Sequence, residues 1–130
     1  MNNHEDAEQA VVFAWAANYR SLRHMFAIPN GAFLAGDKAA RARQMNRLKK
    51  QGLLVGVSDI FLPRAVHSVS GHYNGLFIEM KRRKIDGPSK VSGDQMDFLS
   101  AMDIQGYKTA VCYGADEAIE VIKNYMVRLT

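Results

Sequence analysis

The stretch "GLFIEMKRR", residues 75–83, carries the alternating pattern that decides the fold of this chain. Its side chains divide between two faces, one with Leu76, Ile78 and Met80 and the other with Phe77, Glu79 and Lys81. This period of two predicts a half-buried β-strand over residues 76–82. One face of that strand carries a carboxylate beside an ammonium, so the stretch raises a question of function as well as of fold.

The composition is that of a globular chain of ordinary size. It has 130 residues, of which 48% are hydrophobic, so one domain over residues 1–130 can bury a real core. Cys112 is the only cysteine, which excludes a disulfide scaffold and favours a reducing compartment. The N-terminal stretch MNNHEDAEQA is polar and acidic, unlike a signal peptide, and no apolar run approaches the roughly 18 residues of a membrane span. We therefore expect a soluble, cytoplasmic protein with no membrane contact.

The positive charge is concentrated in two parts of the chain. The net charge is +4, but residues 20–50 hold eight Lys or Arg against one acid, Asp37. A second basic cluster covers residues 81–84, where the alternating strand ends. Such polarity is typical of a surface that binds a polyanion, most often nucleic acid, although a basic helix can also be a solvated face that binds nothing.

The order of predicted elements indicates an α/β or α+β domain with a small mixed sheet flanked by helices. Turn residues such as Pro29, Gly31, Gly52 and Gly106 separate the segments. We expect helices over residues 4–22, 37–51, 94–104 and 116–129, and strands over residues 24–28, 57–62, 76–82 and 107–113. Residues 63–75 are expected to form a polar connection, and residues 84–93 a loop.

Three acids fall on elements that the pattern places in the interior. Glu8 lies on the same helical stripe as Val12, Trp15 and Tyr19, Asp59 lies inside a predicted strand, and Glu79 shares a face with Lys81. Buried carboxylates are costly unless a cation or hydrogen bonds compensate them, and a divalent metal would do so. Each acid also has a simpler explanation: an ion pair on an edge strand for Glu79, a turn cap for Asp59, and an exposed helix face for Glu8.

The types of side chain narrow the choice of metal. Carboxylates without thiolates favour Mg²⁺, with Mn²⁺ as a substitute. Zinc is the competing hypothesis, because the chain also holds His4, His24, His67 and His72. Their spacings match no standard zinc site, so the sequence favours the hard cation.

The same residues resemble the PD-(D/E)XK nuclease superfamily, and more narrowly the VRR-NUC (virus-type replication-repair nuclease) domain. The resemblance spans nearly the whole chain and rests on Glu8, "IPNG" at 28–31, "GVSD" at 56–59, "IEMK" at 78–81 and Gln95. Ser58 stands where the superfamily pattern has proline, a position that binds no metal.

The resemblance implies a restriction-endonuclease-like core and a metal-dependent endonuclease that hydrolyses phosphodiesters in branched DNA, in a phage or bacterial intracellular setting. It implies that Asp59, Glu79 and the Met80 carbonyl hold Mg²⁺, with Glu8 acting directly or through water. Lys81 would orient the attacking water, and Gln95 would lie near Lys81 and the phosphate. Ser92 and Gln95 also form a capping-box pattern, so a purely structural role for Gln95 stays open.

The expected DNA contacts are mostly basic residues directed at phosphates: Asn30, Arg41, Arg43, Arg47, Lys49, Lys50, Arg82 and Arg83. The alternative for Asn30 is a purely structural role in the turn at residues 28–31. The apolar surface of the closing helix, which includes Ala118, Ile119, Val121, Ile122, Tyr125, Met126 and Leu129, suggests a dimer interface or burial within the monomer.

The resemblance favours a homodimer that resolves four-way (Holliday) junctions, because two symmetric cuts need two sites. The alternatives are a non-catalytic basic DNA-binding module and a monomeric flap or restriction-type endonuclease.

Overall fold

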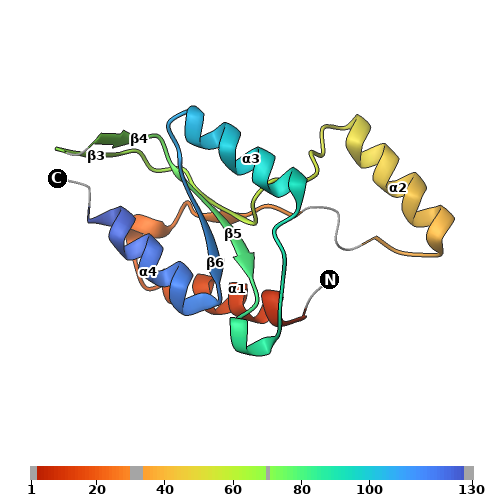
Figure 1. Cartoon of the computed structure of the whole chain (residues 1–130), viewed down its shortest axis with the longest axis horizontal. Coiled ribbons are helices and arrows are strands. Elements are labelled where there is room, and N and C mark those ends of the chain that lie inside the picture. The colour runs from red at the N-terminus through yellow and green to blue at the C-terminus, as the bar shows by residue number, and fades with distance from the viewer. Residues whose placement is uncertain (1–2, 30–33, 70, 128–130) are drawn as a thin grey trace.

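The computed structural model describes residues 3–29, 34–69 and 71–127, and confirms a mixed α/β fold (Figure 1). Asn30 and Leu129, for which sequence roles were expected, lie outside the described residues. The helices are α1 (Asn3–Ala16), α2 (Lys38–Lys50), α3 (Gly93–Ile104) and α4 (Ala115–Met126), with short 3-10 turns η1 (Arg20–Leu22) and η2 (Lys84–Asp86). The strands are β1 (Phe26–Ala27), β2 (Ile60–Leu62), β3 (Val66–Ser68), β4 (Gly71–Tyr73), β5 (Leu76–Lys81) and β6 (Lys108–Tyr113).

The main sheet has the order β1-β2-β5-β6, with β5 inside it. β2 and β5 are antiparallel, with Phe61 opposite Phe77, whereas β5 and β6 are parallel, with Met80 opposite Cys112. All six residues of β5 are buried, so the expectation of a half-buried strand was wrong. The reason is that helices cover both faces of the sheet at β5.

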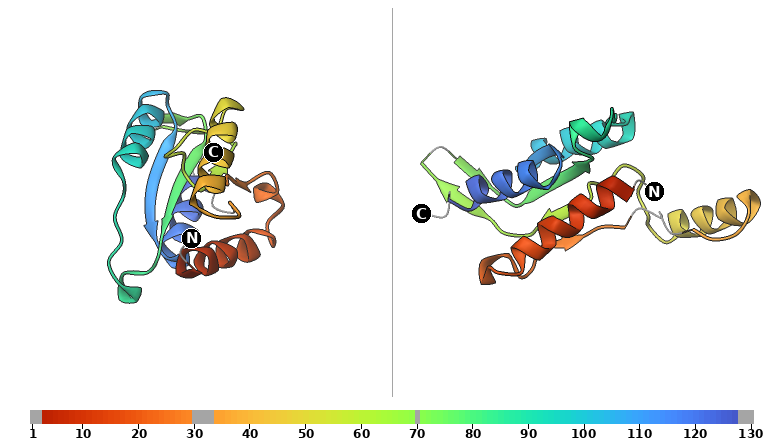
Figure 2. Two further views of the ribbon diagram at one scale, coloured as in Figure 1. Left: turned by 90° about the vertical axis from the view of Figure 1, so that its right-hand side faces the viewer. Right: turned by 90° about the horizontal axis from the view of Figure 1, so that it is seen from below.

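The two faces of β5 meet different helices. Ile78 belongs to the main core with Val12 of α1 and Ile122 of α4, so these two helices share one face. On the other face, Phe77 packs edge-on against Phe98 of α3 and stacks on Phe61. The left view of Figure 2 shows α3 and α1 on opposite sides of the sheet. Glu79 and Lys81 therefore point to the α3 side.

Two segments differ from the sequence prediction. The first helix ends at Ala16 rather than residue 22, and the separate 3-10 turn follows it. The predicted polar connection over residues 63–75 contains the two-stranded sheet β3-β4, in which Val66 pairs with Tyr73. Strands of three residues are too short to show a clear alternation, which is why the pattern missed them.

α2 projects from the body near the end where α1 begins, as Figures 1 and 2 show. None of its residues is buried, although its N-terminus is well formed because Asp37 accepts a hydrogen bond from the Ala40 N–H at 2.8 Å. The helix predicted from the basic pattern is thus confirmed. Local capping and helix propensity hold it, with little packing.

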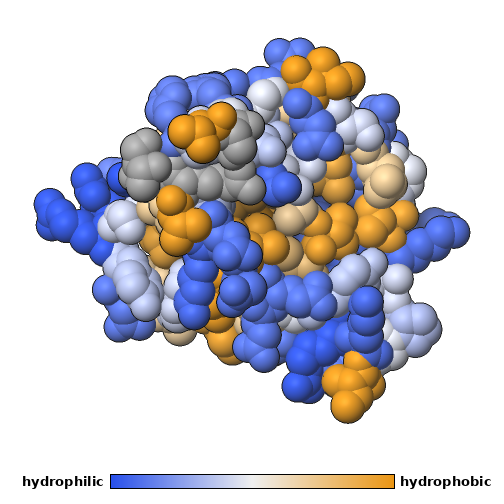
Figure 3. All heavy atoms as spheres, turned by 60° about the vertical axis from the view of Figure 1, so that its left-hand side comes forward, coloured by the Kyte–Doolittle hydropathy of each residue, from blue (hydrophilic) through white to orange (hydrophobic). Residues whose placement is uncertain are grey.

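The apolar surface of α4 is largely used within the chain. Ala118, Ile122 and Tyr125 are buried, and Ile119, Val121 and Met126 pack against the same core. This helix therefore gives less support to a dimer interface than its sequence suggested. Apolar side chains do gather across the middle of the face in Figure 3, with hydrophilic ones around them. No helix within the described residues is long and apolar enough to cross a membrane.

Candidate active site

Asp59 lies immediately before β2 rather than inside a strand. Its Oδ2 accepts a hydrogen bond from the Met80 N–H at 2.7 Å, and its own carbonyl accepts one from the Ile28 N–H at 2.8 Å. The Asp59 side chain thus binds the main chain of β5 at a point where β2 has no residue opposite it. This contact brings Asp59 beside the residue that precedes Met80, which is Glu79.

The loop before Asp59 approaches α3 very closely. Gly56 has a φ of 96°, and a Cβ at this position would lie 2.6 Å from the carbonyl carbon and oxygen of Asp94. A side chain is therefore excluded on two grounds, the left-handed backbone and the contact with α3. The "GVSD" segment needs its glycine so that Asp59 and the start of α3 can converge.

Gln95 joins Glu79 to Lys81. Its Nε2 donates to Glu79 Oε2 at 3.1 Å, and its Oε1 accepts from Lys81 Nζ at 3.1 Å. Lys81 Nζ also lies 3.7 Å from Glu79 Oε2. Glu79 is 1% and Lys81 6% exposed, so both charges are almost removed from water.

The capping role of Gln95 is present at the same time. The Ser92 hydroxyl accepts from the Gln95 N–H at 3.2 Å, and the Ser92 N–H donates to Gln95 Oε1 at 2.9 Å. The two sequence interpretations of Gln95 are therefore compatible. The capping box anchors the amide group, which then presents one end to each charge of β5.

The electrostatics of Glu79 indicate a missing positive charge. Burial, and next the nearby Asp59 carboxylate, raise the pKa of Glu79 to about 9, despite the opposing effect of Lys81. Glu79 Oε1 is buried and has no hydrogen-bond partner. A buried oxygen beside a second carboxylate fits a hard divalent cation, since two acids and no thiolate favour Mg²⁺ or Mn²⁺. Within the described residues, no three His, Cys, Asp or Glu side chains form a metal-binding group by themselves, so main-chain oxygen and water would have to complete the ligand set.

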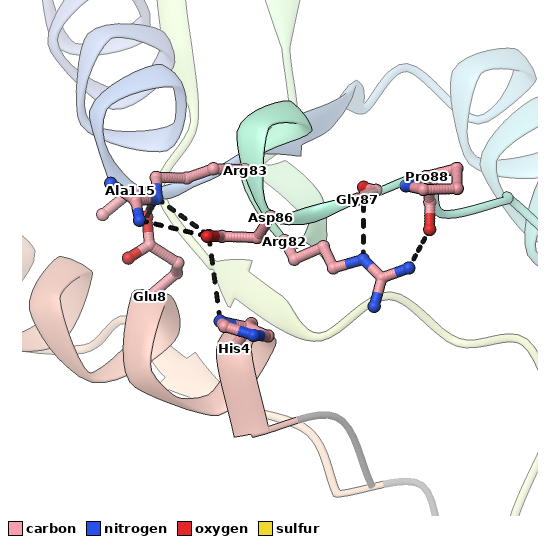
Figure 4. A network of polar contacts seen from close by, with 8 residues as sticks. All are labelled: His4, Glu8, Arg82, Arg83, Asp86, Gly87, Pro88 and Ala115. Carbon is pink, nitrogen blue, oxygen red and sulfur yellow. Dashed lines mark hydrogen bonds and ion pairs between the residues drawn. The ribbon is translucent and has the colours of Figure 1, made fainter.

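Glu8 makes contacts different from those expected. Its Oε1 accepts from the Ala115 N–H at 3.1 Å and lies 3.9 Å from Arg83 Nε (Figure 4). It thereby satisfies a main-chain donor at the start of α4, which has no side-chain cap of its own. This carboxylate supports the junction between α1 and α4.

Glu5 lies one turn before Glu8 on α1, and its pKa responds to the charges of the candidate active site. Its pKa is raised by burial, lowered by Lys81 and raised by Asp59, so it shares the electrostatic environment of these two residues. Glu5 also lies seven residues before Val12, on the same stripe of α1, and Val12 is 0% exposed. The sequence interpretation extended that stripe to Tyr19, which lies beyond the end of α1 and is 47% exposed.

The fold and this geometry agree with the comparisons with known proteins. The model of the VRR-NUC domain family matches residues 2–116. The chain belongs to the VRR-NUC family. A solved structure described as a VRR_NUC domain protein has a TM-score of 0.76 and 22% identity, with 98% of this chain and 92% of that chain covered. None of the curated proteins matches the chain.

VRR-NUC is a nuclease-type family, so the coarse function of the chain is that of a nuclease domain, with DNA as the implied substrate. The structure separates the basic residues expected to contact that substrate into two groups. The first group is exposed along the projecting α2 and comprises Arg41, Arg43, Arg47, Lys49 and Lys50. These side chains are positioned to meet a polyanion without first leaving a buried site.

The second basic group of this VRR-NUC domain is engaged within the chain (Figure 4). Arg82 donates from Nε to the Gly87 carbonyl at 3.2 Å, and its Nη2 donates to the Pro88 carbonyl. Arg83 Nε donates to Asp86 Oδ2 at 2.9 Å. The two arginines therefore organise the loop after β5, a role that the charge pattern alone did not predict.

Proposed function

We propose that this VRR-NUC domain is a metal-dependent, structure-selective DNA endonuclease. The observation that carries the proposal is the cluster of Asp59, Glu79, Lys81 and Gln95, in which Glu79 and Lys81 are buried and Glu79 Oε1 has no hydrogen-bond partner. A pure DNA-binding module gains nothing from buried carboxylates, which repel phosphate. The cluster therefore favours catalysis over binding alone.

Asp59, Glu79 and the Met80 carbonyl are the groups we assign to Mg²⁺, with Mn²⁺ as a substitute. We assign to Glu5 the supporting role that the family resemblance implies for Glu8, directly or through water, because Asp59 and Lys81 both influence the pKa of Glu5. When bound, the cation polarises the phosphate and lowers the pKa of a coordinated water. The Asp59 carboxylate is already oriented for such a role by the Met80 N–H.

Lys81 is the positively charged group that the protein itself contributes to the site, in addition to the metal ion. Its ammonium is held by Glu79 and Gln95, so it can orient the attacking water and stabilise the negative charge that develops on the phosphate. The water oxygen forms the new bond to phosphorus while the bond to the 3′ oxygen breaks. The departing oxygen takes up a proton, leaving a 5′-phosphate and a 3′-hydroxyl.

The substrate would be held mainly by phosphate contacts from α2. Its exposed basic residues lie on a helix that projects from one end of the body, so they can contact phosphates beyond the candidate active site (Figure 2). Asn30 stays a predicted contact. Arg82 and Arg83 would contribute less, since their guanidinium groups already serve the loop after β5.

Resolution of four-way junctions by a homodimer is the finer form of the proposal. Two symmetric cuts require two sites, and one small chain offers one. Because α4 packs inward, a two-fold interface would need exposed apolar side chains beyond those buried by this helix. Sedimentation at micromolar concentration tests this point: a species of only 14.5 kDa that cuts flaps as readily as junctions would replace the dimer with a monomeric flap nuclease.

The direct experiment incubates the protein with labelled duplex, flap and four-way-junction DNA in Mg²⁺, Ca²⁺ or EDTA. We expect cleavage of branched DNA in Mg²⁺ and none in EDTA. Ca²⁺ should support binding with little turnover, because its looser coordination positions water poorly. Binding without cleavage in both Mg²⁺ and Mn²⁺ would favour the non-catalytic module.

A further inference from the structure

The β3-β4 hairpin lies at the opposite end of β5 from the candidate active site. β4 ends at Tyr73, just before β5 begins at Leu76, whereas Glu79 and Lys81 lie toward the other end of β5. Figure 1 shows the hairpin far from the start of α1 and from α2. Any site on the hairpin is therefore separate from the nuclease chemistry.

The hairpin brings two histidines face to face. His67 of β3 and His72 of β4 are directly opposite in the strand register. Their Nδ1 atoms are 2.9 Å apart, and their ring centroids are 4.3 Å apart. Both side chains are exposed to solvent, so a small ion can reach them.

A chain of hydrogen bonds fixes the tautomer of neutral His72. Asn74 Nδ2 donates to the Gln105 carbonyl at 2.9 Å, which leaves Asn74 Oδ1 as the group that faces the ring. Asn74 Oδ1 accepts only, so the His72 Nε2 at 2.6 Å must donate to it. In neutral His72, Nδ1 then carries a lone pair, and that lone pair faces His67.

Histidines that bind metals commonly show this arrangement, in which the second ring nitrogen donates to a carbonyl oxygen and thereby orients the ring. The distance also fits. Two imidazole nitrogens about 2.0–2.1 Å from one metal, at a right angle, are about 2.9 Å apart. In the absence of metal, His67 Nδ1–H donates a hydrogen bond to His72 Nδ1. Metal binding would need that proton to move to the exposed Nε2 of His67.

We propose that His67 and His72 form a two-histidine site for a late first-row divalent ion of the class Cu²⁺ or Ni²⁺, whose coordination geometry places neighbouring ligands at a right angle. Water completes the coordination, and the ion cross-links β3 to β4. A pair of three-residue strands is marginal by itself, so the cross-link would stabilise the hairpin. Imidazole selects this class of ion over Mg²⁺, which keeps the hairpin site distinct from the carboxylates around β5.

The test is calorimetric titration of the untagged full chain with Ni²⁺, in buffer free of Mg²⁺. Asp59→Asn is the background for every sample, because it weakens binding at the carboxylate site. We expect one Ni²⁺ per chain and a rise of about 4 °C in the thermal midpoint at tenfold excess over the dissociation constant. His67→Gln and His72→Gln should each weaken binding at least about tenfold, and Asn74→Ala about tenfold through loss of the orienting bond.

His4→Gln and His24→Gln are the matched controls and should bind Ni²⁺ as the background protein does. Circular dichroism checks that each variant is folded, and His67→Asn replaces any variant that is not. The proposal is overturned by undiminished binding in both hairpin variants, by an equal loss in the controls, or by no detectable Ni²⁺ binding at all.

Discussion

Lys81 and Arg83 lie two residues apart, and each pairs with an acid, but the two pairs behave in opposite ways. Lys81 Nζ is 3.7 Å from Glu79, with side-chain exposures of 7% and 2%. Arg83 Nε is 2.9 Å from Asp86, with exposures of 57% and 16%. The pKa of Glu79 is raised to about 9, chiefly by burial, whereas the hydrogen bond from Arg83 lowers the pKa of Asp86.

Burial, rather than the presence of a basic partner, therefore decides what an acid in this chain can do. Desolvation and a second carboxylate make Glu79 unstable as an anion until a further positive charge arrives. Asp86 is a stable anion that holds a loop. The comparison separates a candidate metal site at Glu79 from a structural ion pair between Arg83 and Asp86, although Glu79 and Asp86 lie within eight residues of one another in sequence.

The largest expected effect follows removal of the charged groups of the candidate active site. Asp59→Ala, Glu79→Ala and Lys81→Ala should each lower the cleavage rate at least about a hundredfold, because the groups act on charge that develops in the transition state. DNA affinity should persist, since the loss of an acid also removes repulsion. Asp86→Asn is the matched control and should cleave within about twofold of the unmodified protein. Normal cleavage by the Glu79→Ala protein would show that Glu79 is not part of the active site.

The two acids of α1 provide the next test. Glu5→Gln should lower cleavage about tenfold or more, with little effect on folding, if this carboxylate serves the site. Glu8→Gln keeps an oxygen that can accept from the Ala115 N–H, so it should cost cleavage only a few-fold. Rates measured on the same branched substrate decide the point. The reverse order of effects would restore the role that the sequence assigned to Glu8.

The pH dependence of stability distinguishes the two pairs without any substrate. The Glu79 carboxyl has an ordinary value of 4.5 and a folded pKa of about 9, so between these values the folded state holds a proton that the unfolded state has lost. Stability of the metal-free protein should therefore fall as pH rises through this window, by at most about 1.4 kcal/mol per pH unit. Denaturation series in EDTA measure the slope, and Glu79→Gln should flatten it. An unchanged slope in this variant would assign the effect to other groups.

Asp86 should act in the opposite sense. Its folded pKa lies below the ordinary 3.8, so its contribution is present above that value and is lost as pH falls. The contribution is small, because exposed ion pairs are screened by solvent.

The smallest effect is expected from single exposed arginines. Arg47→Gln should weaken DNA binding to all sequences alike and reduce the dependence on log salt by about one unit. Arg83→Gln should change that slope less, since Arg83 is already paired with Asp86. Fluorescence anisotropy over a salt series measures both. Equal slopes in the two variants would mean that the Arg83–Asp86 ion pair breaks and that Arg83 contacts DNA.

Much of the architecture followed from local patterns. The alternation of β5, the basic α2 and the capping box at Ser92 all predicted elements that the structure contains. The short hairpin was missed because its strands have three residues each. The length of α1 was overestimated, because the apolar pattern continues to Tyr19 although the helix ends at Ala16. Glu8 does lie on the stripe that faces inward with Val12, and its side chain is 19% exposed.

The sequence by itself determined that Glu79 and Lys81 share one face, because side chains two residues apart on a strand must do so. It also determined that Gln95 caps α3, since a capping box involves only neighbours in the chain. Only the tertiary structure decided that Glu8 accepts from the Ala115 N–H, whereas the pKa of Glu5 responds to Asp59 and Lys81, because packing sets the rotation of a helix about its axis. The same holds for His67 and His72, whose spacing matches no standard site and whose rings meet only because the hairpin pairs them.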